Sequence, residues 1–112
     1  MKKAEQIAIN KVVLETMRKA MNELDSTYRN SVVHWTPLNH CRAGFLFTTS
    51  GHYIVLRSYS TVVAAVDTRD GVCYDFSRWV YGYTATTSQH IYKFAKKFET
   101  YVLSYKHVEM GI

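Results

Sequence analysis

The first quarter of the chain carries apolar residues at the spacing of an α-helix. They recur at steps of three or four residues, which places them on one side of a helix: Ile9, Val13, Met17, Ala20, Leu24 and Tyr28. Charged residues fall on the other side, where Lys11 and Glu15 are four apart and can stabilise the helix. We therefore expect an amphipathic helix over about residues 3–24, ended by residues 25–27. Its apolar side is typical of a helix that covers a sheet, and a dimer contact is the alternative.

Short β-type segments separated by turn residues fill the middle of the chain. Residues 31–35 are a candidate edge strand, which Pro37 would stop. The segments that read as strands after it are 45–49, 52–58, 61–66 and 72–76. Asp70 and Gly71 favour the positive φ of a hairpin turn. Residues 44–76 are thus predicted to form an antiparallel meander, with 61–66 as a strand covered on both sides.

A second amphipathic helix is predicted to begin near Thr86. Thr86 as N-cap and Gln89 three residues later fit a capping box. The apolar stripe of this helix consists of Ile91, Phe94, Ala95, Phe98 and Val102. The residues left for the solvent side are His90, Lys93, Lys96, Lys97 and Thr100, so this helix is basic. Residues 101–108 can extend the helix or form a last strand, and the sequence leaves both open.

Together these elements predict an α+β fold. We expect an antiparallel sheet of four or five strands, with an N-terminal amphipathic helix and a basic C-terminal helix. The 112 residues, of which 47% are hydrophobic, suffice for one core. The chain is therefore predicted to form a single domain over residues 1–112.

The net charge favours an acidic partner. It is +5, with 14 lysines and arginines spread along the chain in runs of no more than two. A positive field raises the rate of encounter with nucleic acid or an acidic protein surface, although no basic tail is present. The oligomeric state stays open.

Cysteine usage and hydropathy bear on the compartment. Cys41 and Cys73 stand far apart, without a second pair that would indicate a metal site or a disulfide framework. Glu5, Asn10 and Lys11 interrupt the apolar stretch that a signal peptide needs. No run reaches the roughly 20 apolar residues that cross a bilayer. We expect a cytoplasmic protein with reduced thiols and no membrane contact.

Motifs for catalysis, metals and cofactors do not emerge from the sequence. The five histidines form no pair spaced four apart on a helix and no Cys/His knuckle. Neither cysteine has a motif around it, and the chain has no Gly-x-Ser-x-Gly elbow and no phosphate loop. The prediction is therefore a protein that is not an enzyme and that holds neither a metal nor a cofactor.

Two sets of residues near the second helix are candidates for binding. Free N–H groups at a helix start can hold a phosphate or carboxylate, so the hydroxyls there are candidate anion ligands, although they can equally cap their own helix: Thr86, Thr87 and Ser88. Aromatic residues interleaved with basic residues are typical of single-stranded nucleic-acid sites and of protein hot spots. The candidate partner-binding residues of this kind are Arg78, Tyr83, His90, Tyr92, Lys93, Lys96 and Lys97.

Two stretches, residues 58–64 and 74–91, carry a family resemblance. Their most specific part is the string Tyr-Gly-Tyr-Thr-Ala-Thr-Thr-Ser-Gln-His of residues 81–90. Residues 42–98 resemble a family of short uncharacterised proteins carried by phages and other mobile elements of Gram-positive bacteria. The resemblance implies a mobile-element setting, in which small proteins often occupy the working surface of a host nuclease, and it supplies no catalytic residue.

Two functions are predicted from these observations. The first is a non-enzymatic binding protein that inhibits a host nucleic-acid-targeting defence system by covering a surface, as anti-CRISPR proteins do. The alternative is a small nucleic-acid-binding protein that uses the lysine-bearing helix together with Tyr83 and Tyr92.

Overall fold

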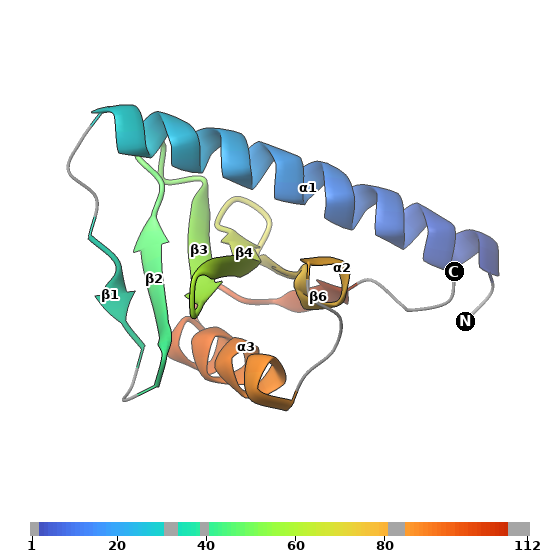
Figure 1. The fold of residues 1–112 in the computed structure, drawn as a ribbon. Coiled ribbons are helices and arrows are strands. Elements are labelled where there is room, and N and C mark those ends of the chain that lie inside the picture. The colour runs from blue at the N-terminus through green and yellow to red at the C-terminus, as the bar shows by residue number, and fades with distance from the viewer. Residues whose placement is uncertain (1–2, 31–33, 39–40, 81–84, 108–112) are drawn as a thin grey trace.

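A mixed sheet of six strands stands between two helices in the computed structural model of the chain (Figure 1). The structure describes residues 3–30, 34–38, 41–80 and 85–107. The elements are α1 (Lys3–Asn30), β1 (Thr36–Pro37), β2 (Ala43–Phe47), β3 (Tyr53–Ser58), β4 (Thr61–Asp67), β5 (Val72–Asp75), α2 (Ser77–Val80), α3 (Ala85–Lys97) and β6 (Ser104–His107). The α+β class is confirmed, but the sheet has six strands rather than four or five.

The strands lie in the sheet in the order in which they occur along the chain. Neighbours from β1 to β5 are antiparallel, which confirms the predicted meander, whereas β6 is parallel to β5. A parallel neighbour needs a crossover connection, and α2 and α3 supply it between β5 and β6. The tail that the sequence left undecided is thus a strand, and the expectation of a purely antiparallel sheet is wrong at its last strand.

The edge strand β1 differs from its prediction. The structure places it at Thr36 and Pro37, where Pro37 pairs with Gly44 of β2. Pro37 is the last residue of this strand, so the strand does end at the proline as predicted. An edge strand tolerates a proline because the missing N–H need not bond to a further strand. Residues 31–33 of the predicted strand lie outside the described residues.

Each face of the sheet carries its own hydrophobic core. Successive residues of β3 alternate between the faces: Tyr53 and Val55 belong to the core beneath α1, and Ile54 and Leu56 to the core beneath α3. The buried apolar side chains of α1 are Val13, Ala20 and Leu24; those of α3 and the turn after it are Ile91, Phe94, Ala95 and Phe98. The predicted apolar stripes are confirmed except at their ends: Tyr28 is exposed, and Val102 lies beyond the end of α3. Of the predicted strand 61–66, residues 63–66 are buried, whereas Thr61 and Val62 are half-buried.

Helix α1 continues six residues past its predicted end, to Asn30. Asp, Ser and Thr are weak helix formers that often end helices, but here tertiary contacts outweigh that tendency. The Thr27 hydroxyl donates to the carbonyl of Glu23 and accepts a hydrogen bond of 2.8 Å from the backbone N–H of Thr49. Thr27 is buried in the contact between the helix and the β2–β3 turn.

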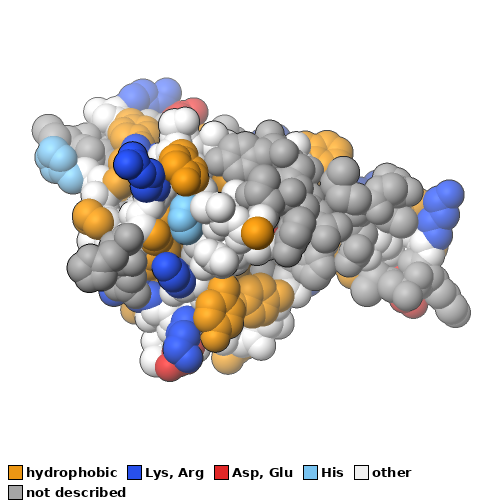
Figure 2. All heavy atoms as spheres, turned by 60° about the horizontal axis from the view of Figure 1, so that its bottom comes forward, with side chains coloured by type: hydrophobic (Ala, Val, Ile, Leu, Met, Phe, Trp, Pro, Cys, Tyr) orange, Lys and Arg blue, Asp and Glu red, His pale blue; other side chains and the backbone are white. Residues whose placement is uncertain are grey.

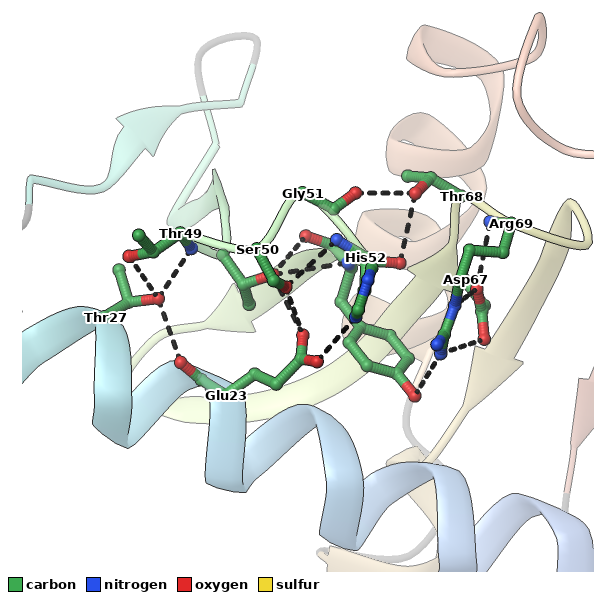
Figure 3. A network of polar contacts seen from close by, with 11 residues as sticks. Glu23, Thr27, Thr49, Ser50, Gly51, His52, Asp67, Thr68 and Arg69 are labelled. Carbon is green, nitrogen blue, oxygen red and sulfur yellow. Dashed lines mark hydrogen bonds and ion pairs between the residues drawn. The ribbon is translucent and has the colours of Figure 1, made fainter.

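A polar network fixes this end of α1 to the sheet (Figure 3). Glu23 accepts a hydrogen bond of 2.7 Å from the Ser50 hydroxyl, and its carboxylate lies 2.8 Å from Nδ1 of His52. Burial opposes the ionisation of Glu23, but the hydrogen bonds from Ser50 and His52 outweigh it, so the pKa of Glu23 is lowered. A charged carboxylate therefore anchors the turn between β2 and β3.

Candidate functional site

The outer side of α3 presents lysines to solvent. Lys93, Lys96 and Lys97 are exposed, and within the part of the chain that the structure describes none of them forms an ion pair. The Nζ atom of Lys97 lies 5.6 Å from the ring centroid of Phe45. Figure 2 shows lysine and arginine side chains beside hydrophobic ones on the side of the molecule that carries α3.

Two exposed tyrosines accompany these lysines. Tyr92 of α3 is 66% exposed and Tyr105 of β6 is 52% exposed. With Lys96 and Glu99 they line a shallow hollow of about 230 Å³ between α3 and β6. We call the surface made by Tyr92, Lys93, Lys96, Lys97 and Tyr105 the lysine–tyrosine face. Tyr105 was not a candidate from the sequence, because its role depends on β6, which the sequence left undecided.

His90 does not belong to the solvent side. It is only 4% exposed, so its predicted position on the outer surface is wrong. Its Nδ1 lies 2.8 Å from the hydroxyl of the fully buried Ser58 at the end of β3. His90 sits one turn before Phe94 on the helix, and the polar partner makes its burial tolerable. Burial and, after it, the charge of Lys93 lower the pKa of His90.

The hydrogen bond between Ser58 and His90 joins the two stretches of the sequence that carry the family resemblance. Ser58 opens the first stretch, and His90 stands near the end of the second. Tyr59 follows Ser58 in the chain, and its ring centroid lies 5.9 Å from that of His90. The sequence does show a serine in the first stretch and a histidine in the second. Their contact could not be predicted from this, because it depends on how α3 packs on the sheet.

A family model describes almost the whole of this fold. The model of DUF8033, a family of unknown function, matches residues 4–109. The chain belongs to DUF8033. The match includes α1, which lay outside the resemblance over residues 42–98. The family description names no phage or host, so the mobile-element setting stays a prediction. No curated protein and no solved structure gives a significant match to the chain.

The hydroxyls at the start of α3 do not form one cluster in this DUF8033 member. The helix already begins at Ala85, so Thr86 lies in its first turn and the prediction of Thr86 as N-cap is wrong. Thr87 is buried, whereas Thr86 is exposed and Ser88 half-buried. An anion site on these three residues stays a prediction. Tyr83 and the side chain of Arg78 lie outside the described residues.

One group of residues has the composition of a catalytic triad but not its geometry. Ser50, His52 and Glu23 gather at the β2–β3 turn (Figure 3), yet the Ser50 hydroxyl donates to Glu23 and not to the imidazole. In a triad the hydroxyl faces the imidazole and the carboxylate orients that imidazole from its far side, whereas here the hydroxyl and the imidazole both contact the carboxylate. Burial raises the pKa of the Cys73 thiol to about 12, which keeps it protonated.

The described residues lack two further features, a metal-binding cluster and a membrane-spanning helix. Within residues 3–30, 34–38, 41–80 and 85–107, no three His, Cys, Asp or Glu side chains are grouped so that they could hold a metal ion. Among the helices of the described segments, none combines the length and the apolar character that a bilayer crossing requires.

Replacing His90 with glutamine should make the free energy of unfolding less dependent on pH between about pH 7.5 and pH 5.5. The pKa of His90 is lower in the folded state than in the unfolded chain. The unfolded chain therefore takes up the proton first as pH falls, and the contribution of His90, present above its unfolded pKa of about 6.5, is lost below it. Urea denaturation at several pH values measures this change. The control is His34→Gln, at an exposed position, which should keep the wild-type pH dependence. The prediction is contradicted if the free energy of unfolding varies equally with pH in the wild type and in both variants.

Proposed function

We propose that this DUF8033 member is a non-catalytic protein that binds single-stranded nucleic acid on its lysine–tyrosine face. The observation that supports the proposal is the composition of that face: lysines without ion pairs among the described residues, next to two tyrosines that are more than half exposed. The net charge of +5 adds a long-range attraction for a polyanion.

The chemistry of this face matches the two requirements of a single strand. Lysine ammonium groups neutralise phosphates, and aromatic rings stack on bases that are not already stacked in a duplex. Tyr92 and Tyr105 stand on α3 and β6, on both sides of a hollow that Lys96 also lines. Helix α3 has 13 residues and is therefore about 20 Å long, enough for a few nucleotides.

The test is the affinity for a labelled oligothymidylate of about 12 nucleotides as salt is raised from about 50 to 200 mM. Wild-type binding should weaken steeply with salt. A variant in which Lys93, Lys96 and Lys97 are glutamine should bind more weakly. The negative slope of log K against log salt should become shallower by about 2, because each phosphate contact on a single strand contributes about −0.7. Tyr92→Ala should weaken binding without changing the slope. Fluorescence anisotropy measures the affinity of each protein at each salt concentration.

The matched control removes the same number of charges elsewhere. Lys3, Lys11 and Lys19 are exposed on α1, and replacing these three with glutamine should leave the slope close to that of the wild type. The proposal would be overturned if the two triple variants lost the same amount of affinity for the oligonucleotide, or if the wild type showed no salt-dependent binding.

Inhibition of a host defence nuclease stays a prediction, and a separate experiment tests it. If the wild type ignores the oligonucleotide but slows such a nuclease, and the α3 triple variant does not, the lysines act on an acidic protein surface. That outcome would replace nucleic acid by protein as the partner of the same face.

A further inference from the structure

An open groove of about 490 Å³ lies where β1 and β2 meet the turn between β3 and β4. Its lining includes two arginines and two aromatic residues, Arg42, Arg57, Trp35 and Tyr59, and none of its described lining residues is acidic. The volume falls within the roughly 300–1,000 Å³ of small-molecule sites. The groove shares no lining residue with the lysine–tyrosine face, so a ligand in it does not depend on the proposed function.

Arg57 is held in the groove with an unsatisfied donor. Its guanidinium carbon lies 4.7 Å from the ring centroid of Trp35, a cation–π distance. Its Nε is buried and has no hydrogen-bond partner among the described residues. A buried N–H without an acceptor is costly, and a guanidinium presents its donors as a planar fork that fits the oxygens of a phosphate.

Local features of the sheet give Arg57 this position. Gly44 of β2 lies opposite Arg57 of β3, and a Cβ at Gly44 would come within 3.2 Å of both Trp35 and the Thr36 carbonyl. The β3–β4 ladder then shifts register: Leu56 pairs with Ala64, but Arg57 pairs with Val62. A bulge of this kind redirects the side chains of a strand. The missing side chain at position 44 lets Trp35 and Thr36 lie close to β2, which brings the indole within reach of Arg57.

The neighbouring aromatic rings are fixed as well. The Trp35 Nε1 donates a hydrogen bond of 2.7 Å to the Tyr28 hydroxyl, which sets the orientation of the indole under Arg57. Tyr59 has a φ of +55°, a value that non-glycine residues rarely adopt. Its backbone N–H donates to the Arg42 carbonyl at 2.7 Å, which holds the strained turn against the groove. Tyr59 is 55% exposed and lines the groove.

We propose that this groove binds a mononucleotide, with the phosphate on Arg57 and Arg42 and the base against the ring of Tyr59. A phosphate balances the two positive charges that Arg57 and Arg42 bring to a lining whose described residues include no carboxylate. The exposed ring of Tyr59 selects a ligand that also has a planar group. A carboxylate or inorganic phosphate satisfies the first condition alone.

Isothermal titration calorimetry with adenosine 5′-monophosphate, adenosine and inorganic phosphate tests the proposal. The wild type should bind the monophosphate more tightly than either fragment. Arg57→Gln should weaken binding of the monophosphate at least about tenfold, because a charge-assisted pair is lost. Arg29→Gln, an exposed arginine at the end of α1, is the charge-matched control and should bind like the wild type. The glutamine variant of Lys93, Lys96 and Lys97 should also keep its affinity, which separates this site from the lysine–tyrosine face.

Tyr59→Gly provides a second variant that is expected to fold, because glycine adopts positive φ without strain. It should weaken binding of the monophosphate while leaving that of inorganic phosphate unchanged. The proposal is overturned if the wild type does not bind the monophosphate, if adenosine binds equally well, or if both Arg57→Gln and Tyr59→Gly bind like the wild type.

Discussion

Replacing Phe94 with alanine should destabilise the protein by about 3–5 kcal/mol, the range for deleting a fully buried aromatic side chain. Phe94 has no exposed surface and lies in the core between α3 and the sheet. Its ring centroid is 5.4 Å from that of Phe98 in an edge-to-face arrangement, so the substitution also removes an aromatic contact. The cavity would lie directly beneath the lysine–tyrosine face.

Urea denaturation, followed by circular dichroism, measures the loss for Phe94→Ala. Tyr92→Ala is the control on the same helix: with 66% of Tyr92 exposed, its replacement should change the free energy of unfolding by no more than about 0.5 kcal/mol. If Phe94→Ala costs no more than Tyr92→Ala, α3 is not docked as described, and the lysines lose their fixed orientation.

Replacing Gly71 with valine should be the second most damaging change. Gly71 has a φ of +73°, where a β-branched residue is strained by about 1–3 kcal/mol. A Cβ there would also lie 2.8 Å from Leu103 Cγ and 2.9 Å from the Tyr101 carbonyl oxygen. The carbonyl of Gly71 accepts hydrogen bonds from the N–H groups of Leu103 and Ser104. Valine should therefore both strain the turn and push the start of β6 away from β5.

The chain offers a control that separates strain from crowding. Gly51 has a φ of +76°, but nothing lies within 4 Å of a Cβ built there. Gly51→Val should show the cost of backbone strain alone, and Gly71→Val should lose more than that in the same denaturation experiment. Equal losses would contradict the prediction, because they would show that crowding against residues 101–103 adds no cost to the backbone strain.

Sequence periodicity was sufficient for most of the fold because it reports local structure. Steps of three and four residues located the apolar sides of α1 and α3, and runs of aromatic, aliphatic and β-branched residues between turn signals located β2 to β5. The predictions from the sequence are wrong or incomplete where a contact with a residue far away in the chain determines the local structure. Thr27 ends a helix by propensity but is held inside one by Thr49, and residues 104–107 become a strand only because β5 is beside them.

The same distinction applies to the binding surfaces. The lysines of α3 could be placed on the outer side from their spacing alone, whereas His90 could not, because its burial depends on the Ser58 hydroxyl on β3. Arg57 and Trp35 are 22 positions apart in the chain and come into contact only through the pairing of β1, β2 and β3. No local pattern contains the register that brings them together.

The parallel pairing of β6 with β5 has a consequence for the order of folding. Strands β1 to β5 are joined by short connections, so each can pair with its predecessor soon after both exist. Strand β6 must instead wait until the crossover through α2 and α3 has closed a long loop, whose entropic cost precedes any gain from pairing. We therefore expect the meander to act as the nucleus, and the docking of β6 to come after it as a late step in the kinetics.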